Sequence, residues 1–95
     1  MQVIDRKFKF VATNPCKNSI YTEENAIVFC AKDKALSAAL SAYRFECVRL
    51  QCGKEHIESI DLLRKRVFEF QRDIKCKTPD TETECEIDRC INGKL

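Results

Sequence analysis

The sequence predicts a mainly α-helical protein built around an antiparallel pair of amphipathic helices between Leu36 and Ile74. Apolar residues recur at steps of three and four in two neighbouring segments, which is the period of an α-helix. Gly53 follows the last periodic residue of the first segment, where helices commonly end in a left-handed conformation that glycine adopts freely. Only two glycines and two prolines occur in 95 residues, which argues against a many-turned all-β protein.

The two predicted helices span about residues 33–52 and 54–75, and each carries one apolar stripe. Asp33 is the expected N-cap of the first helix. Because the connection at Gly53 is short, the two helices are expected to lie side by side and antiparallel. The stripes consist of Leu36, Leu40, Tyr43, Cys47 and Leu50 in the first helix, and of Ile57, Ile60, Leu63, Val67, Phe70 and Ile74 in the second.

The N-terminal third predicts a short β segment and a short helix. Phe8 and Phe10 alternate with lysines within residues 3–12, which is typical of a strand with one buried face. Thr22 and the two acids after it predict the start of a helix over about 22–32. Residues 26–31 are wholly apolar and would suit a buried strand as well, but the cap favours a helix.

The expected domain organisation is one helical domain over residues 1–77, with its N-terminal strand, followed by a tail over 78–95. That tail carries five acids against two bases, contains two cysteines and shows little periodicity. We therefore expect it to be loosely ordered.

Composition restricts the setting and the partners of the protein. The formal net charge of +2 is too small to imply a nucleic-acid or membrane partner by itself. No run approaches the roughly 18 apolar residues that a membrane-spanning helix needs. The first residues lack the apolar core of a secretory signal, and seven cysteines is an odd number, so we expect a reducing cytoplasm with mostly free thiols.

The cysteines and the single histidine are the candidates for chemistry. Four of them would form a zinc site if the tail folded back onto the helix–helix turn: Cys52, His56, Cys85 and Cys90. The preferred interpretation places Cys47 in the core, leaves the tail thiols free, and expects neither metal nor cofactor. Cys52 and His56 as a nucleophile–base pair would need a third, orienting group that the sequence does not show, so no enzyme is predicted.

Four apolar residues lie outside the stripes: Phe45, Val48, Leu62 and Phe68. The favoured interpretation packs them against residues 26–31 and the N-terminal strand. If those segments do not cover them, they form a protein-binding surface or a homodimer interface, for which we select Phe45, Leu62 and Phe68. Nucleic-acid binding is the alternative, through six basic residues: Arg6, Lys7, Lys9, Arg64, Lys65 and Arg66. Acids near the second cluster offset its charge, so nucleic acid is not the expected partner.

The middle of the chain resembles a group of small uncharacterised bacteriophage and prophage proteins. The resemblance rests on the segments 21–36, 43–47 and 56–67, with their Thr-acid-acid and Ala-Lys-Asp sequences, and it covers about residues 20–74. It implies a phage- or prophage-encoded accessory protein of the host cytoplasm and supplies no catalytic residues. The predicted function is therefore non-enzymatic and based on protein–protein interaction.

Overall fold

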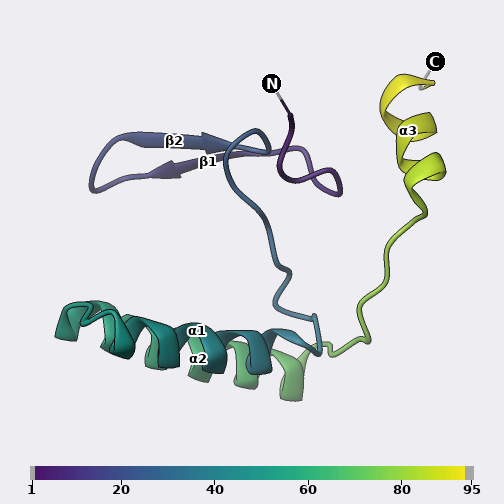
Figure 1. The fold of residues 1–95 in the computed structure, drawn as a ribbon. Coiled ribbons are helices and arrows are strands. Elements are labelled where there is room, and N and C mark those ends of the chain that lie inside the picture. Colours follow the sequence, from purple (N-terminus) through teal and green to yellow (C-terminus); the bar gives the residue numbers. More distant parts are fainter. Residues whose placement is uncertain (1, 94–95) are drawn as a thin grey trace. The chain divides into compact units, whose positions relative to one another are not determined.

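The computed structural model describes residues 2–93, which form two short strands and three helices (Figure 1). These elements are β1 (Val11–Asn14), β2 (Ser19–Thr22), α1 (Leu36–Arg49), α2 (Lys54–Asp73) and α3 (Glu84–Asn92). Helices make up most of the regular structure, which confirms the mainly α class. The chain divides into two compact units, Phe29–Pro79 on the one hand and Met1–Val28 with Asp80–Leu95 on the other. No helix in the described part of the chain is long and apolar enough to cross a bilayer.

Helices α1 and α2 form the larger part of the first unit. Residues 50–53 join them, and α2 returns alongside α1 (Figure 1). The seam between them buries Leu36 and Cys47 of α1 and Ile60 and Val67 of α2. All four belong to the predicted stripes, so burial of these apolar side chains drives the packing of the two helices.

Backbone and amide hydrogen bonds tie the two ends of this unit together. The Nε2 atom of Gln71 donates to the carbonyl oxygens of Ala31 and Asp33, at 2.8 and 2.7 Å. Asp33 also accepts a hydrogen bond from the backbone N–H of Ala35 through Oδ1, at 2.8 Å. That bond closes a turn before the helix, so α1 begins at Leu36 and not near residue 33 as predicted.

The two strands form an antiparallel hairpin, with Val11 opposite Thr22 and Asn14 opposite Ser19. The predicted strand over 3–12 is therefore misplaced, and its partner β2 was not predicted. Residues 8 and 10 are half-buried between exposed lysines, as the alternation predicted, but they do not belong to the ladder. Residues 15–18 form the turn, and Asn18 adopts a left-handed conformation with φ of 55°.

The predicted helix over 22–32 is wrong, because a turn follows β2 and residues 26–30 form no regular element. Thr22 Oγ1 accepts from the N–H of Glu24 at 3.2 Å, and Asn25 Oδ1 accepts from the N–H of Thr22 at 3.0 Å. Such local bonds stabilise a turn as readily as a helix start. The N–H of Val28 then donates to Asp5 Oδ2 at 2.8 Å, which removes a donor that a helix would use.

Asp5 is a buried polar group in the unit that contains the β-hairpin, and its side chain accepts three backbone hydrogen bonds. Oδ1 accepts from the N–H groups of Lys7 and Phe8, each at 2.9 Å, and Oδ2 accepts from Val28. Burial alone would raise the pKa of Asp5. The bonds from Phe8, Val28 and Lys7 outweigh burial and lower that pKa below its usual value.

Helix α3 lies within residues 78–95, the tail that the sequence predicts to be loosely ordered. Thr83 and Glu86 form a capping box at its start: Thr83 Oγ1 accepts from the N–H of Glu86 at 3.2 Å, and Glu86 Oε1 accepts from the N–H of Thr83 at 2.9 Å. Ile87 is its buried residue. The cap and this one apolar anchor explain how nine residues of acidic sequence form a helix.

We predict that replacing Asp5 with alanine destabilises the unit that contains the β-hairpin. The variant leaves three backbone N–H groups without their acceptor, and hydrogen bonds to a charged group contribute about 1.5–3 kcal/mol each. Amide hydrogen exchange should show lost protection at Lys7, Phe8 and Val28. Glu24→Ala, at an exposed turn position, is the control and should leave that protection unchanged.

The same carboxylate predicts a pH dependence. Because folding lowers the pKa of Asp5, its stabilising contribution is present above the unfolded pKa of about 3.9 and disappears as pH falls through the folded pKa. Protection factors at Phe8 and Val28 should therefore differ between the native chain and Asp5→Ala at neutral pH and converge at strongly acidic pH. A difference that stays constant over that range would contradict this assignment.

Candidate functional site

The turn between α1 and α2 is closed around Gln51, which adopts a left-handed conformation with φ of 61°. The N–H of Gln51 donates to the carbonyl of Val48, and the N–H of Cys52 donates to the carbonyl of Cys47, both at 3.0 Å. These two bonds define a Schellman motif with Gln51 at the left-handed position. The predicted left-handed Gly53 is wrong: its φ is −60° and its ψ is 155°, and it is the N-cap of α2.

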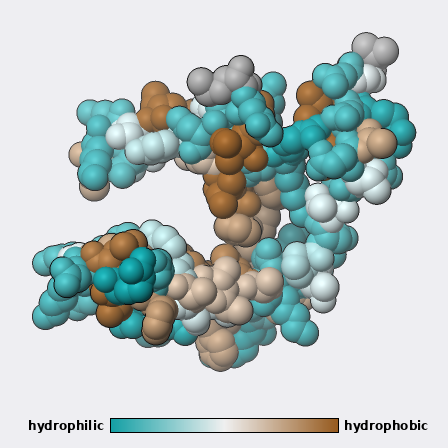
Figure 2. Space-filling view, in the orientation of Figure 1, coloured by the Kyte–Doolittle hydropathy of each residue, from teal (hydrophilic) through white to brown (hydrophobic). Residues whose placement is uncertain are grey.

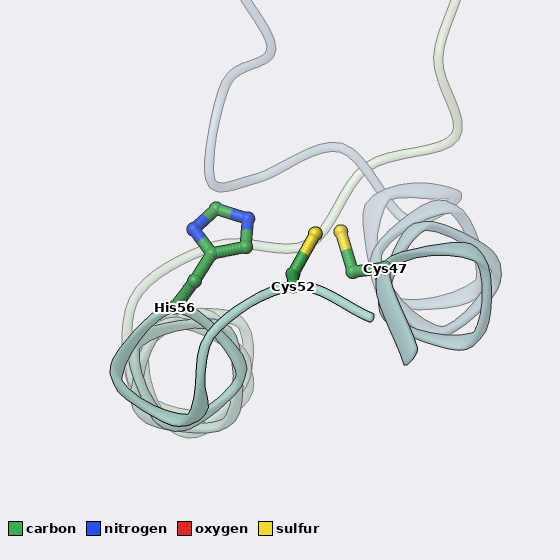
Figure 3. A group of neighbouring side chains, drawn as sticks. All are labelled: Cys47, Cys52 and His56. Atoms are coloured by element: carbon green, nitrogen blue, oxygen red, sulfur yellow. The ribbon is translucent and has the colours of Figure 1, made fainter. Parts of the chain in front are cut away.

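This motif brings Cys47, Cys52 and His56 together (Figure 3). A Schellman motif places the side chains at the positions of Cys47 and Cys52 in contact across the end of the helix. His56 lies in the first turn of α2, where its N–H donates to the carbonyl of Gly53 at 3.1 Å. The two sulfur atoms and a ring nitrogen of His56 all lie within 4.8 Å of one another.

The three side chains of the cluster differ in their exposure to solvent. Cys47 is buried, Cys52 is half-buried and His56 is exposed. The hydroxyl of Tyr43 lies 3.4 Å from Nε2 of His56, and the two rings meet edge to face with centroids 6.1 Å apart. The site is therefore open to solvent on the imidazole side and closed on the side of Cys47.

Two ionisable groups at the site, Tyr43 beside the cluster and Cys52 within it, favour their neutral forms. A hydrogen bond with Cys47 is the largest contribution that raises the pKa of Tyr43. Burial, followed by the hydrogen bond with Cys47, raises the pKa of the Cys52 thiol. At neutral pH Cys52 is therefore held as a thiol, which is a poor nucleophile.

The structure places the four predicted zinc ligands in two groups. Cys52 and His56 meet at the turn, where Cys47 joins them. Cys85 and Cys90 are exposed on α3, in the other unit. They are five positions apart in the sequence, which places them about 140° apart around the helix axis. Sequence reasoning assigned Cys47 to the core alone, although the spacing Cys-x4-Cys-x3-His across a predicted turn was visible.

Two of the three basic candidates near the N-terminus, Arg6 and Lys7, have acidic or carbonyl partners. The guanidinium of Arg6 forms ion pairs with Glu84 and Asp88 of α3. The ammonium group of Lys7 donates to the carbonyl of Asp80. These contacts reduce the positive potential that a phosphate backbone would meet at this segment.

On α2, Arg64 donates to the hydroxyl of Ser41 at 2.9 Å and lies 3.9 Å from the carboxylate of Asp61. Arg64 is thus used partly to hold α2 against α1. The remaining basic candidates are exposed: Lys9, Lys65 and Arg66.

The predicted partner-binding residues are exposed but do not share one face. The exposed fractions of Phe45, Leu62 and Phe68 are 74%, 55% and 60%. Phe45 lies about half a turn around α1 from the buried Leu36, and Leu62 and Phe68 lie about 120° apart around α2. Phe68 also contacts the guanidinium of Arg72, 5.8 Å from the ring centroid.

Searches against protein-family models, curated proteins and solved structures found no match to this chain.

We predict that Gln51→Val destabilises the helix pair by about 1–3 kcal/mol, because a β-branched residue is strained at a positive φ. Gln51→Gly removes the side chain without that strain and is the matched control. Thermal unfolding followed by circular dichroism compares the two. Equal losses of stability in both variants would show that the Gln51 side chain, and not its backbone conformation, matters at the turn.

Proposed function

We propose that the protein is a non-enzymatic accessory protein that self-associates through the outer face of α1. The observation that carries this proposal is the distribution of apolar residues around α1. Leu36 and Cys47 are buried in the seam with α2, whereas Phe45 and Val48 are exposed on other sides of the same helix. A helix that is apolar around most of its circumference is normally covered on more than one side. Apolar side chains accordingly reach the surface over the helix pair in Figure 2.

The N-terminal half of the outer face of α1 lacks charge, as the centre of a protein interface does. Ser37 to Tyr43 contains no charged residue. Arg44 is engaged with Asp61 of α2, with its Nε 2.6 Å from Oδ1. A second helix can therefore approach this half of the face without desolvating an ion pair, and the exposed Arg49–Glu46 pair lies at the C-terminal end of α1.

The spacing of large and small residues favours a second copy of the chain as the partner. Ala38 and Phe45 are seven residues apart, so they lie on the same face two turns from each other. When two α1 helices pack antiparallel about a two-fold axis near residues 41 and 42, each Phe45 meets Ala38 of the other copy. This isologous arrangement fills the hollow above a small residue with a large one, twice.

The buried core is small, so self-association would add stability that the helical unit lacks by itself. In the described part of the helical unit, four residues of α1 and α2 are buried: Leu36, Cys47, Ile60 and Val67. Small domains without disulfides commonly gain the missing stability by oligomerisation. Burial of Phe45 and its neighbours would supply it at about 25 cal/mol per Å² of apolar surface.

The resemblance of residues 20–74 to small phage and prophage proteins supports an accessory role in a host cytoplasm. Leu62 and Phe68 lie off the α1 face, and we assign them to contacts with a further protein. Nucleic-acid binding has less support, because Arg6 and Arg64 already pair with carboxylates.

A residue swap tests the interface. Phe45→Ala removes the large residue and Ala38→Phe creates a clash with Phe45 of the other copy, so each should raise the dissociation constant about tenfold or more. The double variant Ala38→Phe/Phe45→Ala restores one large and one small residue at each contact and should recover association. Size-exclusion chromatography with light scattering, over a concentration series, measures all three.

Glu58→Ala is the control, because Glu58 is exposed on α2, outside the proposed interface. It should leave the dissociation constant unchanged. A native chain that stays monomeric at the highest soluble concentration would contradict the proposal. A double variant no better than the single variants would contradict the antiparallel pairing of Phe45 with Ala38.

A further inference from the structure

We propose that Cys47, Cys52 and His56 bind one zinc ion at the turn between α1 and α2. This site goes beyond the proposed self-association and lies on the opposite side of α1 from Phe45. It differs from the ligand set that the sequence suggested, because Cys47 replaces both cysteines of α3.

The geometry of the cluster suits a tetrahedral metal. Zinc binds cysteine sulfur at about 2.3 Å and histidine nitrogen at about 2.0–2.1 Å, so two sulfur ligands lie about 3.8 Å apart and sulfur and nitrogen about 3.6 Å apart. The three ligand atoms here all lie within 4.8 Å of one another. Side-chain rotation closes that difference, and the backbone around Gln51 needs no rearrangement.

The donor set selects the kind of ion. Two thiolates and an imidazole are soft to borderline ligands, which suit zinc and are poorly matched to magnesium or calcium. Two thiolates also balance the charge of a divalent zinc ion. Three protein ligands leave a fourth position, and the exposed side of His56 is where a water molecule or an external ligand would complete the tetrahedron.

The backbone around the turn holds two of the ligands in place. The Schellman bonds fix the two cysteines by their backbone, so little conformational entropy remains to be lost when the metal binds. The hydroxyl of Tyr43 lies 3.4 Å from Nε2 of His56. On metal binding it would release that nitrogen, and it could then hydrogen-bond to a ligand in the fourth position. No acidic side chain is needed at the site.

Zinc binding to the fully reduced full-length chain tests the proposal. We expect one zinc per chain by elemental analysis after gel filtration, and cobalt substitution should give the intense visible absorption of a tetrahedral thiolate site. Cys47→Ser, Cys52→Ser and His56→Asn should each weaken zinc binding by about 100-fold or more, since even the outer partners of metal ligands contribute about 10–100-fold. His56 is exposed, so its variant reports on the metal even if loss of the buried Cys47 disturbs folding.

Cys85→Ser/Cys90→Ser is the matched control, and it should keep both the stoichiometry and the cobalt spectrum. The proposal is overturned if the reduced chain binds no zinc, or if His56→Asn and Cys47→Ser bind it as well as the native chain. Loss of binding in Cys85→Ser/Cys90→Ser would also overturn the proposed three-ligand set. Phe45→Ala removes no zinc ligand, so it should keep one zinc per chain and the cobalt spectrum whether or not the chain self-associates.

Discussion

The left-handed backbone of Gln51 is the constraint on which the helical unit depends. A non-glycine residue pays about 1–2 kcal/mol for this conformation, and two backbone hydrogen bonds at the end of α1 offset that cost. One closed turn then sets two features at once. It directs α2 back along α1, so that Ile60 and Val67 can be buried, and it brings Cys52 and His56 to Cys47.

Different interactions stabilise each of the two units. In the helical unit, the seam is apolar and the polar contacts lie at its edges, as in the Arg44–Asp61 ion pair. In the unit with the β-hairpin, the buried side chain of Asp5 accepts three backbone hydrogen bonds and so fixes the surrounding chain. A hairpin of two four-residue strands offers too little apolar surface for a core of its own, so a buried carboxylate organises the chain instead.

The sequence predicted the elements whose signals are long and local. Periodicity over 14 and 20 residues located α1 and α2 to within a few positions. It failed at residues 22–32 because Asp5 binds Val28 across 23 positions of sequence, a contact that no local pattern reports.

The end of α1 was placed at Gly53 because glycine is the usual left-handed residue. By contrast, the Thr83–Glu86 capping box was readable and was missed. At the candidate site, the sequence predicted Cys52 and His56 as possible metal ligands. Cys47 was assigned to the core, because it belongs to the apolar stripe of the first helix.

The last turn of α1 lies between the proposed zinc site and the proposed interface. Cys47 faces the seam, and the adjacent Val48 and nearby Phe45 face outward, so the same turn would carry a metal ligand inside and the dimer contacts outside. The ends of helices fray first, because their last carbonyls lack intrahelical partners. A metal held by Cys47, Cys52 and His56 would tie this end to the start of α2 and suppress the fraying. Phe45 and Val48 would then be presented on a rigid helix, and association would cost less conformational entropy. Zinc would in that way strengthen self-association without touching the interface.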